Sequence, residues 1–204
     1  GRHLYSIVGG LPDEQDMPSV THIIGVINKP ALVGWAAREA LDGVRRELYT
    51  LLGDKTSTDV RLDISWIDSV LEAAAKRPEK VKMDAGGFGT RAHAAADSFL
   101  KNGRWPEDVP DLDPVKASFF KWWSGGRKII HGDAYVASKE YRYAGAFDCV
   151  EARPDGLWIL DFKTSNGLWP EMRVQLGGYS LAFRETFGIK PAGATVLRFG
   201  KKVA

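Results

Sequence analysis

The most restrictive feature of the sequence is a pair of apolar runs, residues 141–152 and 156–163, joined by the tetrapeptide RPDG. Pro, Asp and Gly in this order are typical of a tight turn, and the flanking runs contain β-branched and aromatic residues that favour strands. A third run, residues 127–138, has the same character. The chain is therefore expected to form an antiparallel meander of strands over residues 127–163.

Helical patterns precede this meander. A helix is expected to begin near Pro30, because the fixed φ of proline suits a first helical position. Apolar residues recur at helical spacing over residues 63–76, and Pro78 is expected to end that helix. The glycine-rich segment 84–89 predicts a turn, followed by a further helix over residues 90–102.

The remaining elements complete a mixed architecture. A short helix is expected over residues 114–123, a longer one from Pro170, and a last strand within residues 192–204. This order predicts an α/β fold with a central mixed sheet flanked by helices. We expect an N-terminal helical segment over residues 1–85 and a core over residues 86–204, within one compact domain overall.

Composition excludes some kinds of protein. The formal net charge of +2 is too small to indicate a nucleic-acid-binding protein by itself. Cys149 is the single cysteine, so an intramolecular disulfide and a cysteine-ligated zinc or iron–sulfur site are excluded for this chain alone. No apolar stretch approaches the roughly 20 residues that cross a bilayer, and we expect a cytoplasmic protein with no membrane partner.

Two charged residues stand in the last strand of the meander. Alternation along a strand places Asp161 and Lys163 on one face, with Leu160 and Phe162 on the other. If the two strands joined by the RPDG turn pair, Asp148 shares a face with Val150 and lies alongside Asp161. This arrangement predicts two carboxylates and one ammonium in a small patch.

The patch has a structural and a chemical interpretation. The Asp-x-Lys pair alone is more often an ion pair at the end of a strand. A second carboxylate without a second cation favours a divalent metal, because an unpaired buried charge is costly. Magnesium or manganese suits carboxylate ligands, and His93 could add a nitrogen ligand. Lys163 beside such a metal would position water against a phosphodiester.

Three segments together resemble a known family. They are GTRAHAAADSFL (89–100), YAGAFDCVEARPDGLWILDFKTSNG (143–167) and VQLGGYSLAF (174–183). The set resembles the RecB-like branch of the PD-(D/E)xK nuclease superfamily, which includes phage exonucleases and the CRISPR-adaptation nucleases. The resemblance implies a restriction-endonuclease-like core.

The resemblance also implies roles for particular residues. His93, Asp148 and Asp161 match the family's metal ligands, and Lys163 matches its catalytic lysine. Gln175 and Tyr179 match the Gln-x-x-x-Tyr pattern of the branch, although such a pair is also common on a packed helix.

The sequence departs from the family pattern at one strand and at the cysteines. Many relatives carry a glutamate on the strand before Asp148, where this chain offers Asp133, or Glu140 in a shifted register. The iron–sulfur cluster of some relatives requires four cysteines, so it is expected to be absent here.

Several residues near the expected site are candidates for DNA contacts, although each is equally explained as surface or core. They are Arg91, Thr164, Ser165, Trp169 and Arg173. We therefore expect a magnesium- or manganese-dependent DNA nuclease that works with phage or bacterial recombination or repair proteins. Exonuclease action is favoured over endonuclease action. The alternatives are an inactive DNA-binding or assembly module with the same fold, and a metal-independent carboxylate-pair hydrolase acting on sugars.

Overall fold

A computed structural model describes residues 4–5, 16–27, 29–53 and 64–200. Its internal contacts divide the chain into two compact units. The first, which we call the sheet unit, comprises Gly1–Ile27 and Gly89–Ala204; the second, the helical unit, comprises Asn28–Phe88. The segment before Ile27 therefore belongs with residues more than sixty positions further along the chain.

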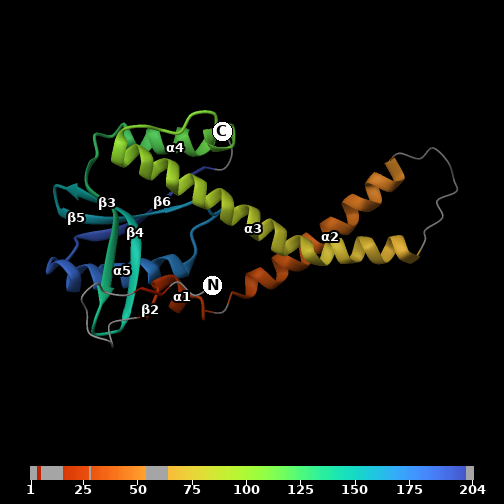
Figure 1. The fold of residues 1–204 in the computed structure, drawn as a ribbon, viewed down its shortest axis with the longest axis horizontal. Helices are drawn as coiled ribbons and strands as arrows, with labels where there is room; N and C mark the ends of the chain where they lie inside the picture. The colour runs from red at the N-terminus through yellow and green to blue at the C-terminus, as the bar shows by residue number, and fades with distance from the viewer. Residues whose placement is uncertain (1–3, 6–15, 28, 54–63, 201–204) are drawn as a thin grey trace. The chain divides into compact units, whose positions relative to one another are not determined.

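The sheet unit contains a four-stranded sheet in the order β3-β4-β5-β6. Its strands are β3 (Lys128–Ser138), β4 (Tyr143–Arg153), β5 (Gly156–Lys163) and β6 (Gly193–Arg198). The first three are antiparallel neighbours, whereas β6 runs parallel to β5 (Figure 1). The expected meander and mixed sheet are thus confirmed.

A helix connects the two parallel strands and covers one face of the sheet. It is α5 (Pro170–Phe187), which begins at Pro170 as predicted from the sequence. Its buried side chains pack on the sheet in a cluster with the short helix α1 (Val20–Ile24). The members of this cluster are Val20, Val136, Tyr143, Phe147, Val150, Ile159, Tyr179, Ala182 and Phe183.

The opposite face is covered by the end of α3 (Ile64–Asn102) and by α4 (Asp113–Trp123), as Figure 1 shows. An aromatic group fills this layer: Phe119 of α4 contacts Phe99 of α3, Phe162 of β5 and Phe199. The alternation predicted for β5 is therefore confirmed, because Ile159 faces α5 while Phe162 faces α4. Short elements complete the unit: β1 (Leu4–Tyr5) pairs with β2 (Met17–Pro18), and the turn η2 (Pro110–Leu112) precedes α4.

The helical unit is formed by α2 (Pro30–Gly53) and the first part of α3. The two helices approach closely at Gly43, where an added Cβ would lie 3.4 Å from Ala74. Arg77 on α3 forms an ion pair with Glu39 on α2, with 3.3 Å between Nε and Oε2. The expected helix start near Pro30 is confirmed.

The end predicted at Pro78 is wrong, and so is the turn predicted over residues 84–89. The helix α3 continues without interruption from Ile64 to Asn102. Pro78 lacks an N–H and removes one helical hydrogen bond, but packing on both sides offsets this local cost. Val70 and Ala74 are buried before it, and Ala92, Ala95 and Ala96 are buried after it.

Candidate metal and phosphodiester site

The candidate site lies where β4 and β5 separate. Their ladder runs from Arg153 opposite Gly156 to Cys149 opposite Leu160 and is not continued to Asp148. Instead, the Phe162 backbone N–H donates to Asp148 Oδ2 at 2.5 Å. The side chain of Asp148 thus takes the place of a backbone acceptor.

The prediction that Asp148 shares a face with Val150 is wrong, because the alternation of β4 is irregular at this point. Phe147 and Val150 both lie in the cluster against α5, although strict alternation would place them on opposite faces. The alternation of β4 is therefore interrupted between them, at the point where its ladder with β5 ends. This interruption lets Asp148 reach α3 instead of pointing with Val150 toward α5.

Helix α3 supplies the histidine. His93 Nδ1 and Asp148 Oδ1 lie 2.6 Å apart, and the imidazole also meets the ring of Phe162 edge-on. Burial lowers the pKa of His93, but the hydrogen bond and negative charge of Asp148 outweigh it, so that the pKa is raised above its usual value. The protonated imidazole is thus favoured next to Asp148.

Strand β5 supplies the second carboxylate and the lysine. The Lys163 ammonium forms an ion pair with the buried Asp161 Oδ2. The side chain of Asp161 is 5% exposed and that of Lys163 is 23% exposed. Burial raises the pKa of Asp161, and the adjacent Lys163 only partly opposes this effect.

The donor types suit a divalent cation, but their present arrangement is closed. Among the described residues, no three His, Cys, Asp or Glu side chains are placed to hold one metal ion. Both oxygens of Asp148 are already engaged, one by the Phe162 amide and one by His93. Binding a metal through these groups requires His93 and Asp148 to exchange their mutual contact for the ion. The buried Asp161 carboxylate and the Asp148 carboxylate are hard oxygen donors of the kind that magnesium and manganese prefer.

The pair predicted on α5 adjoins the site. Gln175 Nε2 donates to the Tyr179 hydroxyl at 2.8 Å, and both side chains are buried. Burial raises the pKa of Tyr179, and the negative charge of Asp161 raises it further. Gly145 makes room for this ring, because an added Cβ would lie 2.6 Å from Tyr179 Cε1.

The two candidates for the family glutamate differ in position. Asp133 lies on β3 between Gly132, which pairs with Cys149, and Ala134, which pairs with Phe147. Its backbone is therefore level with Asp148, while its side chain lies outside the described part of the chain. Glu140 lies in the turn between β3 and β4, where its backbone N–H donates to Glu185 at 3.4 Å.

The candidate DNA contacts lie on several different elements. Arg91 pairs with Asp111 at 2.6 Å, and the Ser165 hydroxyl donates to the Gly167 carbonyl at 2.6 Å. Thr164 packs against α3, since an added Cβ on Gly89 would lie 3.2 Å from its hydroxyl oxygen. The last two candidates, Trp169 and Arg173, line a separate cavity beside β6.

Asp97 is a polar residue of the site that the sequence analysis did not single out. It lines a cavity of about 230 Å³ together with His93, Asp148 and Phe162. Its Oδ2 pairs with Lys101 at 2.8 Å, whereas its buried Oδ1 has no hydrogen-bond partner among the described residues. The spacing in AHAAAD, with Asp97 one helical turn after His93, was the available signal.

Comparison of the sequence with models of known families and with curated proteins gives no match. Among the helices described, none combines the length and the apolar character needed to cross a membrane.

Proposed function

We propose that this protein is a metal-dependent DNA nuclease with a restriction-endonuclease-like core, related to the RecB-like branch of the PD-(D/E)xK superfamily. The observation that carries the proposal is that two pairs, Lys163 with Asp161 and His93 with Asp148, lie close enough for their charges to interact where β4 and β5 separate. A buried carboxylate paired with a single, partly exposed ammonium is a costly arrangement for structure alone. Such perturbed groups concentrate at functional sites.

The charges of the four side chains support a role for a cation. With His93 protonated, the two carboxylates are balanced by one imidazolium and one ammonium, which accounts for the closed arrangement. Asp148, Asp161 and His93 are the residues that would hold magnesium or manganese once His93 loses its proton. A bound cation of this kind would polarise the phosphodiester and lower the pKa of a water molecule.

Lys163 has a separate task in this proposal. Its ammonium lies beside Asp161 and is more exposed than that carboxylate, so it can reach both a phosphate oxygen and an attacking water. A fixed positive charge at this position stabilises the negative charge that develops on the phosphate during attack. Ammonium groups also orient water through hydrogen bonds.

The proposed substrate is DNA. Exonuclease action is favoured over endonuclease action because the family resemblance includes phage exonucleases. The proposed setting is the cytoplasm of a bacterial or phage-infected cell, with recombination or repair proteins as partners. No iron–sulfur cluster belongs to the proposal, because Cys149 is the single cysteine.

End-labelled single- and double-stranded oligonucleotides incubated with magnesium, manganese or EDTA provide the test. The wild-type chain should release labelled products with either metal and none with EDTA. Lys163→Ala should reduce cleavage by at least about a hundredfold while the protein remains folded. Lys190→Ala, at an exposed lysine beyond α5, is the matched control and should cleave normally. Cleavage that persists in EDTA, or full activity of Lys163→Ala, would overturn the proposal.

A second candidate function is an inactive DNA-binding or assembly module. It is favoured by the closed arrangement in which, among the described residues, no three donors converge on one ion. Such a module would bind the same oligonucleotides but release no product with either metal.

A further inference from the structure

A second cavity lies beside the edge of the sheet and is separate from the one at His93. Its volume is about 450 Å³, within the range of ligand pockets. The walls come from the loop after β5, the first turns of α5 and strand β6. The lining residues are Leu168, Trp169, Pro170, Met172, Arg173, Leu176, Ala194, Thr195 and Val196.

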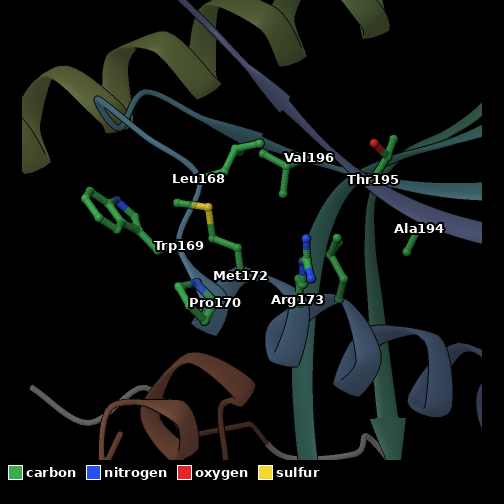
Figure 2. A pocket seen from close by; sticks show the side chains of 9 residues that line it. Leu168, Trp169, Pro170, Met172, Arg173, Ala194, Thr195 and Val196 are labelled. Carbon is green, nitrogen blue, oxygen red and sulfur yellow. The ribbon is translucent and has the colours of Figure 1, made fainter. Parts of the chain in front are cut away.

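The chemistry of these walls is selective. Most of the lining is apolar, and among the described residues that line the cavity there is no carboxylate; Arg173 and Thr195 contribute its charged and hydroxyl side chains. Figure 2 shows Leu168, Met172 and Val196 around the cavity, with Arg173 rising from α5 and Trp169 at the start of that helix. A flat apolar ligand with negative charge attached fits this combination better than a cation or a sugar.

Trp169 is held in place but left accessible. An added Cβ on Gly167 would lie 3.4 to 3.7 Å from three atoms of its indole ring, so the ring packs across the Gly167 backbone. The residue is nevertheless 48% exposed, and the neighbouring Leu168 is 66% exposed. An aromatic ring that is fixed on one side and open on the other is a stacking surface.

The cavity is connected to the candidate site through the sheet. Val196, which lines the cavity, is the β6 partner of Asp161 in the parallel ladder. Thr195 is the partner of Leu160 in the same ladder. Trp169 also follows Lys163 by six residues along a single loop. One wall of the cavity is therefore the strand that pairs directly with the strand of Asp161 and Lys163.

We propose that the cavity binds one unpaired base of a DNA strand whose neighbouring phosphodiester lies at Asp161 and Lys163. The base stacks on Trp169 and contacts the apolar side chains of Leu168 and Met172, and the Arg173 guanidinium contacts a phosphate of the same strand. This inference rests on the proposed function, and it specifies single-stranded DNA, or a frayed end of a duplex, as the form that is bound. Stacking of this kind tolerates every base, so little sequence preference is expected.

The test is a comparison of protein variants with altered oligonucleotides in EDTA. The probe is a dye-labelled single strand of about 12 nucleotides, within the site sizes of single-strand-binding proteins. In a series of probes, one base at a time is removed to leave an abasic position. Dissociation constants are measured by fluorescence anisotropy for the wild-type chain, Trp169→Ala, Trp169→Phe and Arg173→Gln. Arg184→Gln, an exposed arginine later on α5, is the control.

The expected result is a loss of DNA affinity that depends on both Trp169 and the base that stacks on it. Trp169→Ala should weaken binding of the intact strand by roughly tenfold, and Trp169→Phe by much less. One abasic position in the probe should weaken binding to the wild-type chain by a similar factor. The same abasic probe and the intact probe should bind Trp169→Ala equally well. Arg173→Gln should weaken binding to all probes and reduce its salt dependence, whereas Arg184→Gln should not.

Failure of this inference can be distinguished from failure of the proposed function. If abasic positions weaken Trp169→Ala and the wild-type chain equally, the base-binding cavity is refuted while metal-dependent cleavage stands on its own assay. If binding shows the expected coupling but no metal supports cleavage, the cavity stands and the nuclease does not. If Trp169→Ala leaves DNA affinity intact but changes the oligomeric state in light scattering, the cavity holds another copy of the chain and the inference is wrong. Absence of any DNA binding refutes it as well.

Discussion

Buried carboxylates of the sheet are neutralised in two different ways. Glu151 on β4 is 2% exposed and pairs with Arg127 at 2.9 Å and with Arg153 at 2.7 Å. Asp161 is similarly buried but pairs with one lysine. A doubly paired carboxylate is typical of a structural ion pair, whereas a singly paired one retains the capacity to bind another cation. The contrast within one sheet marks Asp161 as the residue with unused binding capacity.

The pair formed by His93 and Asp148 predicts a pH-dependent stability in EDTA. Because the pKa of His93 is raised in the folded chain, the folded protein binds this proton more tightly than the unfolded one. The stabilisation is therefore complete below the ordinary histidine pKa of about 6.5 and is lost as pH rises through the folded value. Urea unfolding between about pH 5.5 and 8.5 measures it.

Two histidine variants separate this effect from others. His93→Gln should lose the part of the pH dependence that belongs to the pair, while His22→Gln, at an exposed histidine of α1, should keep it. An unchanged slope in His93→Gln would show that the proton is not shared with Asp148 in solution.

A glycine opposite Tyr179 provides a second prediction. In Gly145→Ala the new Cβ would lie 2.6 Å from the Tyr179 ring and 3.1 Å from Val20, so the ring must shift from its place beside Phe147. We expect a lower melting temperature and reduced cleavage. Gly177→Ala is the control, since that helical position has open space and should be neutral or stabilising. Equal behaviour of the two variants would contradict the packing of Tyr179.

The long helix α3 carries two glycines whose surroundings differ. Gly86 has nothing within 4 Å of an added Cβ, whereas at Gly89 the Cβ would lie 3.2 Å from Thr164. Gly86→Ala should therefore raise the free energy of unfolding by about 1 kcal/mol through helix propensity. Gly89→Ala should gain less or lose stability. Circular dichroism during chemical unfolding compares them, and a destabilised Gly86→Ala would show that α3 is interrupted there.

The same helix shows where local sequence signals fail. Pro78 and the glycines of residues 84–89 predicted an end and a turn, yet α3 passes through both, because buried residues such as Ala74 and Ala92 outweigh local propensity. The strands and α5 were predictable since their patterns agree with their packing: RPDG joins β4 to β5, and Pro170 begins α5.

The candidate site was predictable to a similar extent. Asp161 and Lys163 are brought together on β5 as the period of a strand requires. The interrupted alternation at Asp148 has no local sequence signal, because it arises from the separation of two paired strands. Asp97 was missed for a related reason, since its relevance depends on which face of α3 meets β4.

At the scale of the whole molecule, the sheet unit depends on a segment from near the start of the chain. Val20 of α1 is 4% exposed and belongs to the cluster formed by the sheet and α5. Its side chain lies close to the backbone of both Gly145 and Gly178. The wall behind Tyr179 is therefore completed by a residue more than a hundred positions before it.

This dependence predicts a stability change from a small substitution. Val20→Ala should lower the free energy of unfolding by about 2 kcal/mol, because it removes buried methyl groups and leaves a cavity. Val26→Ala is the matched control, since Val26 is 85% exposed. Urea unfolding of both variants is the measurement. Similar midpoints would mean that α1 does not pack on α5 in solution.

The double engagement of Asp148 bears on how natural variants of this chain should be interpreted. A copy that had lost cleavage would still benefit from Asp or Asn at position 148, because either supplies the acceptor for the Phe162 amide. The side chains of Asp161 and Lys163 instead form an ion pair with each other. Selection on folding alone would therefore preserve position 148 and would tolerate joint replacement of positions 161 and 163 by apolar residues. The residues at positions 161 and 163, more than the residue at position 148, would therefore distinguish an active variant of this protein from an inactive one.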